Sequence, residues 1–239
     1  MQDTESMMVA LPRPTPDRPL MGLTVLVVED SRFASEALRL MCLRSGARIR
    51  RADCLYSARR HLKVYRPSVV VIDLGLPDGS GADLIAELAA ARPRVDVILA
   101  ISGQDDAGVG AIDAGADAFL AKPLESLGAF QNAVLSNLPP DRHPKGPHLV
   151  SDEAVRPDPL AFIDDMDHAA EALCDLQDTR MIDYAARFLC GVARSAHDDD
   201  LYAAARAVRT GRDGGAPLVS AAAHLAGLVQ QRRGAARAV

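Results

Sequence analysis

Short apolar runs alternate with amphipathic segments through the first 138 residues of the chain. The runs of branched aliphatic residues predict buried strands at residues 24–28, 47–51, 69–73, 95–101 and 118–120. The segments between them repeat apolar residues at helical spacing, which predicts helices over residues 32–45, 55–65, 82–91, 106–114 and 124–138. Five strands that alternate with five helices predict an α/β fold with a doubly wound, five-stranded parallel sheet.

The pattern changes after residue 138. A proline-rich stretch at residues 139–157 predicts a linker, and no strand signal follows it. Apolar residues then form four helical stripes, within residues 160–173, 182–192, 201–208 and 218–229. They predict a C-terminal helical domain over residues 158–233, a four-helix bundle made within one chain or across a dimer, followed by a tail at 234–239. At the other end, four prolines predict a disordered or extended leader over residues 1–21, before the α/β domain of residues 22–138.

Composition limits the partners. The formal net charge of -5 makes nucleic acid an unlikely partner, because binding to phosphates requires a basic surface. No apolar run is long enough to span a membrane, so we expect a cytoplasmic protein without membrane contact. The four cysteines form no CxxC pair and lie in apolar segments, which favours buried, reduced thiols.

Polar residues follow the predicted strands at the points where those strands end. Glu29 and Asp30 follow the first strand, Asp73 ends the third, and Ser102 and Lys122 follow the fourth and fifth. The carboxyl ends of parallel strands form the ligand-binding edge of such a sheet, so these side chains are expected to meet there. Taken alone, Asp73 could equally cap the next helix or begin the turn that follows.

Three carboxylates that converge on one point repel each other, so their joint presence requires a cation or a raised pKa. Ligands that are all oxygen suit a hard divalent ion, which makes Mg2+ the expected cofactor. A lone carboxylate beside such an ion, with a lysine and a hydroxyl opposite, is typical of phosphoryl transfer. Asp73 would be the nucleophile that forms an acyl phosphate, Lys122 would pair with the phosphoryl oxygens, and Ser102 would donate a hydrogen bond to another oxygen.

The motifs around these residues are Val27-Val28-Glu29-Asp30, Asp73-Leu74-Gly75-Leu76-Pro77-Asp78-Gly79-Ser80-Gly81, Ser102-Gly103, Ala114-Gly115-Ala116-Asp117-Ala118-Phe119-Leu120 and Lys122-Pro123. In order and spacing they resemble the receiver domains of two-component response regulators, which have a flavodoxin-like fold, and the similarity runs through residues 22–138.

This resemblance implies that Asp73 accepts a phosphoryl group from a histidine kinase or a histidine phosphotransfer protein. It implies that Glu29, Asp30, Asp73 and the backbone carbonyl of Gly75 hold Mg2+. It also implies that Ser102 and Phe119 form a switch pair, in a signalling protein rather than an enzyme. An added charge of nearly -2 would bias such a two-state surface.

The sequence departs from the family's pattern in the segment that usually takes part in the output. From Ser102 to Lys122 the segment is about two residues shorter than usual in the family and carries four glycines, so the fourth helix is expected to be short. Because that helix contributes to the usual signalling and dimer face, the usual mode of output is in doubt, whereas the phosphoacceptor chemistry is little affected.

The helical half indicates an output through protein contacts. Over residues 150–239, Asp and Glu outnumber Arg and Lys by fourteen to ten, which disfavours a phosphate-binding surface. The stretch Ala186-Arg187-Phe188-Leu189-Cys190-Gly191 faintly resembles the core motif of histidine phosphotransfer bundles, with Arg187 at the histidine position. This implies a degenerate bundle kept for docking or dimerisation. The expected output is therefore a protein partner or a homodimer, and the alternative is a DNA-binding transcriptional regulator controlled by receiver phosphorylation.

Overall fold

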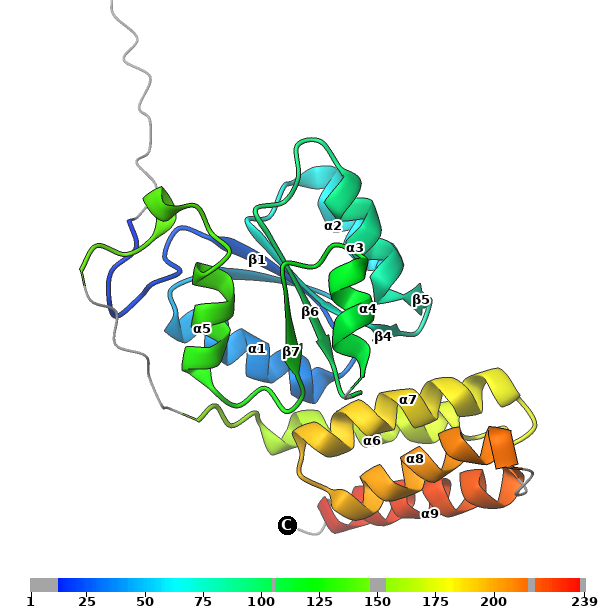
Figure 1. The fold of residues 1–239 in the computed structure, drawn as a ribbon. Coiled ribbons are helices and arrows are strands. Elements are labelled where there is room, and N and C mark those ends of the chain that lie inside the picture. The colour runs from blue at the N-terminus through cyan, green and yellow to red at the C-terminus, as the bar shows by residue number, and fades with distance from the viewer. Residues whose placement is uncertain (1–12, 105, 147–153, 215–217, 237–239) are drawn as a thin grey trace, which may run out of the picture.

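The computed structural model describes residues 13–104, 106–146, 154–214 and 218–236. Figure 1 shows an α/β sheet domain above a bundle of four helices, with the bundle lying against one edge of the sheet. Within the described residues, no helix is both long enough and apolar enough to cross a membrane.

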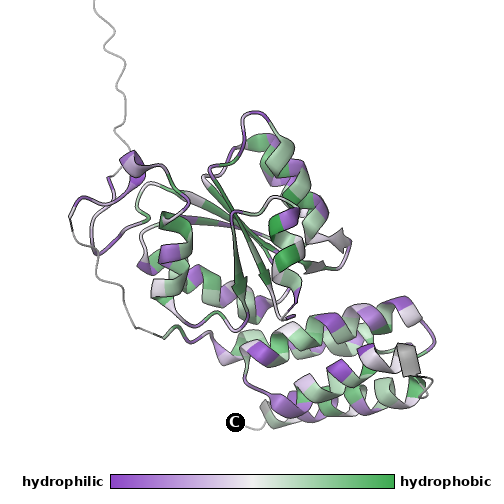
Figure 2. Ribbon diagram, viewed as in Figure 1, coloured by the Kyte–Doolittle hydropathy of each residue, from purple (hydrophilic) through white to green (hydrophobic). Residues whose placement is uncertain are grey.

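The sheet contains five parallel strands in the order β2-β1-β3-β6-β7. Their bounds are β1 (Thr24–Val28), β2 (Arg48–Ala52), β3 (Val69–Asp73), β6 (Val97–Ser102) and β7 (Ala118–Ala121). Every residue of β3 and β6 is buried, as expected for central strands with helices on both faces. These strands form the apolar centre of the domain in Figure 2. The predicted doubly wound parallel sheet is confirmed.

Five helices cover the two faces of this sheet. They are α1 (Arg32–Arg44), α2 (Leu55–Val64), α3 (Gly81–Ala90), α4 (Ala107–Asp113) and α5 (Leu127–Leu135). Helices α1 and α5 bury one face, and α2, α3 and α4 bury the other, so the domain has two apolar clusters separated by the sheet. Helix α1 begins where Ser31 Oγ accepts a hydrogen bond from the Ala34 amide, and Gly46 follows the helix with a φ of 82°.

The structure differs from the sequence-based expectations at several places in this domain. The predicted loop after Asp73 contains a short antiparallel hairpin of β4 (Gly75–Leu76) and β5 (Gly79–Ser80). Part of the expected leader is ordered, because Leu20 is fully buried in the cluster beside α1 and its amide bonds to Ser45 O. Residues 1–12 lie outside the described part of the chain.

The four predicted C-terminal helices are present, with their own apolar core. They are α6 (Pro159–Ala172), α7 (Thr179–Ser195), α8 (Asp199–Gly214) and α9 (Leu218–Ala236), preceded by a short 3-10 helix, η1 (Pro140–Arg142). Helix α9 extends into the expected tail. The stripe predicted for this segment includes Leu160, Met166 and Leu173; Met166 and Leu173 are buried, whereas Leu160 is 66% exposed. The buried face of α6 also includes Asp165 and Ala169.

Helix α7 is covered on nearly all sides, because it lies between the sheet domain and the rest of the bundle. Its residues Ile182 and Leu189 belong to the bundle core, and Tyr184 and Gly191 approach the sheet domain. Two cysteines also depart from the prediction of burial: Cys174 is exposed and Cys54 is half-buried, and the four thiols are free.

Candidate phosphoacceptor site

The strand register brings the predicted site residues to one edge of the sheet. Asp73 is paired with Ile101 in the ladder between β3 and β6. Past the strand ends, the Lys122 amide donates to Ser102 O over 2.8 Å and the Glu29 amide donates to Ala52 O over 2.9 Å. These backbone bonds fix where each side chain leaves the sheet.

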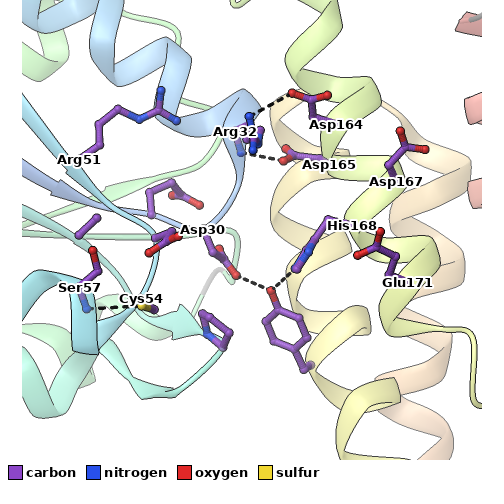
Figure 3. A pocket seen from close by; sticks show the side chains of 15 residues that line it. Asp30, Arg32, Arg51, Cys54, Ser57, Asp164, Asp165, Asp167, His168 and Glu171 are labelled. Carbon is purple, nitrogen blue, oxygen red and sulfur yellow. Dashed lines mark hydrogen bonds and ion pairs between the residues drawn. The ribbon is translucent and has the colours of Figure 1, made fainter.

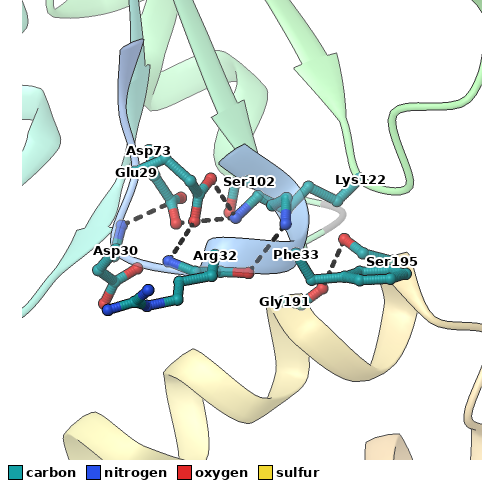
Figure 4. Close-up of polar contacts among 12 residues, drawn as sticks. Glu29, Asp30, Arg32, Phe33, Asp73, Ser102, Lys122, Gly191 and Ser195 are labelled. Carbon is teal, nitrogen blue, oxygen red and sulfur yellow. Dashed lines mark hydrogen bonds and ion pairs between the residues drawn. The ribbon is translucent and has the colours of Figure 1, made fainter. Parts of the chain in front are cut away.

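Three carboxylates and one ammonium group meet at this edge (Figure 4). Glu29, Asp30 and Asp73 each contribute an oxygen to a group whose members all lie within 4.8 Å of one another. The Lys122 Nζ donates to Asp73 Oδ2 over 2.9 Å and lies 2.7 Å from Glu29 Oε2. The lysine and Glu29 are almost completely buried, so the lysine is the internal counter-ion of this cluster.

The pKa shifts reflect this crowding. Burial, together with the Asp73 carboxylate, raises the pKa of Asp30 to about 7. Burial also raises the pKa of Glu29 well above its usual value, although the Lys122 ammonium opposes the shift. Burial alone would lower the pKa of Lys122, but the carboxylates of Asp73 and Glu29 outweigh it, and the pKa is raised. The site therefore holds more negative charge than one lysine can balance.

This excess charge fits a divalent cation. The donor atoms are all oxygen, which is the ligand type that Mg2+ and Ca2+ prefer. A bound cation would relieve the raised pKa values of Asp30 and Glu29, because it stabilises the ionised carboxylates. Gly75 lines a small cavity beside the three carboxylates. Its amide donates to Asp73 Oδ1 over 3.3 Å, so the chain that follows Asp73 is held against the cluster. The ligand role of its carbonyl stays a prediction.

Ser102 and Phe119 have different surroundings. Ser102 is buried and lines the cavity above Asp73, where its Oγ accepts a hydrogen bond from the Gln104 amide over 3.1 Å. The Phe119 ring is half-buried and packs beside Gly108 of α4, where an added Cβ would lie 3.1 Å from ring atom Cδ1. The ring thus contacts α4, and its role in a switch with Ser102 stays a prediction.

Asp165 of α6 joins the bundle to the start of α1. It is 1% exposed, and its carboxylate accepts hydrogen bonds from Ser31 Oγ over 2.7 Å, the Arg32 amide over 2.7 Å and the Phe33 amide over 3.1 Å. The first amides of a helix have no partner within the helix and attract an anion. The bundle therefore places the carboxylate of Asp165 at the N-terminus of α1, directly after Asp30 in the chain.

Tyr184 of α7 makes a second link. Its hydroxyl donates to Asp30 Oδ2 over 2.9 Å, and His168 Nε2 lies 2.8 Å from the same hydroxyl (Figure 3). Since the tyrosine proton is directed to Asp30, His168 donates to the tyrosine oxygen. His168 thus supports a contact to one of the predicted metal ligands.

Two glycines allow the α7 backbone to lie against the site. A Cβ on Gly103, next to Ser102, would lie 3.0 Å from the Gly191 Cα, and a Cβ on Gly191 would lie 3.5 Å from Lys122 Nζ. The cavity left above the cluster measures only about 20 Å³. It is lined on the sheet side by Asp73, Ser102 and Lys122, among others, and on the bundle side by Arg187, Phe188, Cys190 and Gly191.

A larger cleft opens on the other side of Asp30. It measures about 790 Å³ and lies between the sheet domain and α6, with Arg32 and Arg51 on one wall and Asp164, Asp167 and Glu171 on the other (Figure 3). Asp30 and Glu29 line both spaces, so the cluster is reached from this cleft on the side of Asp30, while α7 covers it on the side of Asp73 and Lys122.

Residues 25–133 match the family model described as the response regulator receiver domain. Together with the parallel sheet and its acidic edge, this identifies that part of the chain as a receiver domain. The resemblance predicted from the strand-end motifs is confirmed.

Curated proteins and a solved structure are similar to this part of the chain. The chain is 32% identical over 107 residues to the KDP operon transcriptional regulatory protein KdpE of Escherichia coli (strain K12), a match that covers 45% of this chain and 47% of that protein. It is 32% identical over 133 residues to the response regulator MprA of Mycobacterium sp. (strain KMS), covering 54% and 57%. A solved response regulator from Burkholderia pseudomallei, with a phosphorylated aspartic acid and a calcium ion, is similar at 30% identity and a TM-score of 0.43, covering 48% of this chain and 68% of that one.

The chain spans about half the length of the curated relatives it matches. Some of their names describe regulators of transcription, so the prediction that nucleic acid is an unlikely partner gains no support from them.

Proposed function

We propose that this protein is a response regulator in which Asp73 accepts a phosphoryl group from a phosphohistidine donor, in a reaction that requires Mg2+. The observation that carries the proposal is the cluster at the strand ends, where Lys122 bonds to Asp73 while Glu29 and Asp30 converge on the same point. The donor would be a histidine kinase or a histidine phosphotransfer protein.

In this reaction an oxygen of the Asp73 carboxylate attacks phosphorus, the P–N bond to the donor imidazole breaks, and the leaving imidazole takes up a proton. Lys122 stays within reach of the transferred group and balances its charge, and the Ser102 hydroxyl donates to a phosphoryl oxygen. Glu29, Asp30, Asp73 and the Gly75 carbonyl would hold Mg2+, which when bound supplies further charge neutralisation to the phosphoryl group.

Labelling with acetyl phosphate, followed by intact mass, tests the acceptor. Asp73→Asn should abolish the added phosphoryl mass, and Asp96→Asn is the matched control because Asp96 pairs only with Arg66 and Arg142 in the described contacts, away from the cluster. Glu29→Gln combined with Asp30→Asn should remove the dependence on Mg2+. Label that persists in Asp73→Asn would refute the assignment.

We further propose that the helical bundle carries the output, through a protein partner or through dimerisation. The direct contacts of Asp165 and Tyr184 with the β1–α1 turn support this, because they join the bundle to the predicted site. Mass determination with and without beryllofluoride should reveal a change of oligomeric state if a homodimer forms.

Regulation of transcription is the second candidate, and the names of the relatives favour it. The acidic balance of residues 150–239 opposes it. A mobility-shift assay across ionic strengths separates the two, since binding to DNA should weaken steeply as salt is raised.

A further inference from the structure

We propose that the helical bundle closes the phosphoacceptor site of its own receiver domain, so that phosphoryl transfer to Asp73 requires the bundle to move away. This inference rests on the proposed function of Asp73. It assigns to α7 the role of a cover and to Asp165 and Tyr184 the role of the contacts that hold the cover in place.

The space above Asp73 is too small for the reaction. A cavity of about 20 Å³ has room for about one water molecule. A phosphoryl group brings three oxygens around phosphorus, and the donor imidazole must stand opposite Asp73 in line with the bond that breaks. The α7 residues Phe188 and Gly191 line this cavity opposite Asp73, so a donor protein has no room to place its imidazole there in the closed arrangement.

The contacts that hold the bundle are polar and specific. Asp165 accepts three hydrogen bonds from the β1–α1 turn and the start of α1, and Tyr184 donates to Asp30. Farther out, Arg209 of α8 donates to the Gln104 side chain over 3.1 Å. The bonded residues lie in two loops beside the acceptor site, the β1–α1 turn and the loop after β6. Docking of the bundle is therefore linked directly to access to Asp73.

The same interface is suited to opening. The bundle has its own apolar cluster, and the sheet domain has two others, so the domains do not share a common core. Among the described residues, the aromatic contact between them is one edge-to-face pair, Phe33 with Phe162, with ring centroids 5.9 Å apart. Two domains that each keep their core can separate without unfolding, which is the usual condition for relative domain motion.

A larger side chain at Gly191 of α7 tests the closure while leaving the residues of the receiver domain unchanged. Gly191→Ala adds a Cβ that meets Lys122 Nζ at an ordinary contact distance of 3.5 Å, so the bundle should still dock. Gly191→Leu extends beyond this Cβ into the lysine and should force α7 away from the site. The alanine variant is thus a matched control for the leucine variant.

Removal of a holding contact provides the second test. Asp165→Ala deletes the buried carboxylate, and Asp164→Ala is its control because Asp164 is 52% exposed and pairs with Arg32 over 3.4 Å at the surface. Asp165→Ala should label at least about tenfold faster, since the loss of even one of its three hydrogen bonds to the carboxylate corresponds to about that factor. The readouts on the full chain are the rate of labelling of Asp73 by acetyl phosphate and the radius of gyration from small-angle X-ray scattering.

We expect Gly191→Leu and Asp165→Ala to be labelled faster than their controls and to have a larger radius of gyration. Labelling at the wild-type rate in both variants would overturn the closure, whatever the scattering shows. Failure of the proposed function has a different signature, because then neither the wild type nor any variant would acquire label that depends on Asp73.

Discussion

Lys122 is the cation on which the stability of the acidic cluster depends. Replacing it with methionine keeps the approximate length of the side chain but removes the charge that pairs with Glu29 and Asp73. The lysine side chain is 2% exposed, and the carboxylate side chains are 0% and 11% exposed. Removing one partner of a buried ion pair costs about 3–5 kcal/mol, because the remaining charges stay buried without compensation. In a protein of this size each kcal/mol lowers the melting temperature by about 2–4 °C.

We therefore expect Lys122→Met to melt roughly 6 to 20 °C below the wild type at pH 8 without divalent ions. Circular dichroism in the presence of a chelator measures this shift. Lys63→Met is the control, since Lys63 is exposed at the end of α2 and its loss should have little effect. If the cluster holds Mg2+ as proposed, the ion at one hundred times its Kd should restore about 2.7 kcal/mol, because a ligand that binds only the folded state stabilises it. If Lys122→Met melts at the same temperature as the wild type in the presence of the chelator, the lysine does not balance the negative charge of the cluster as described.

Three further outcomes follow. In urea unfolding, Gly81→Ala should destabilise the protein by about 3 kcal/mol, because the added Cβ would lie 2.0 Å from Asp73 O. Gly110→Ala is the control: its Cβ meets open space in α4, so it should stabilise the protein by up to about 1 kcal/mol. Burial raises the pKa of Asp30 to about 7, so without metal the folded chain binds a proton that the unfolded chain releases near 3.8. The melting temperature should then fall as pH rises from about 4 to 7, while the affinity for Mg2+ in calorimetry rises over the upper part of this range; equal affinities at pH 6 and 8 would contradict this. Arg232→Ala should destabilise the bundle by about 1–2 kcal/mol in the same urea assay, because it removes two hydrogen bonds to Asp198.

The fold and the acidic cluster could be predicted because both follow from local pattern and topology. An apolar run such as Val69–Ile72 indicates a central strand, and the parallel order then places Asp73 beside Asp30. Asp165 could not be found in this way, because its partner Ser31 lies 134 residues away and its neighbours on α6 are also acidic. Helix α7 did carry a signal, since its apolar and small residues form a wide face and leave one narrow polar stripe that includes Arg180 and Arg187, and a wide apolar face is typical of a helix with neighbours on more than one side.

The β1–α1 turn couples the two halves of the molecule through three successive residues. Glu29 pairs with Lys122, Asp30 accepts from Tyr184, and Ser31 donates to Asp165. A metal ion or a phosphoryl group at the cluster and the docked bundle therefore act on the same short segment. Coupling between two binding events is reciprocal, so if docking lowers the equilibrium phosphorylation of Asp73 tenfold, phosphorylation must weaken docking by the same factor, about 1.4 kcal/mol. Phosphorylation of Asp73, which the docked bundle opposes, would then release the bundle. The coupling runs through the β1–α1 turn and needs no longer pathway through the fold.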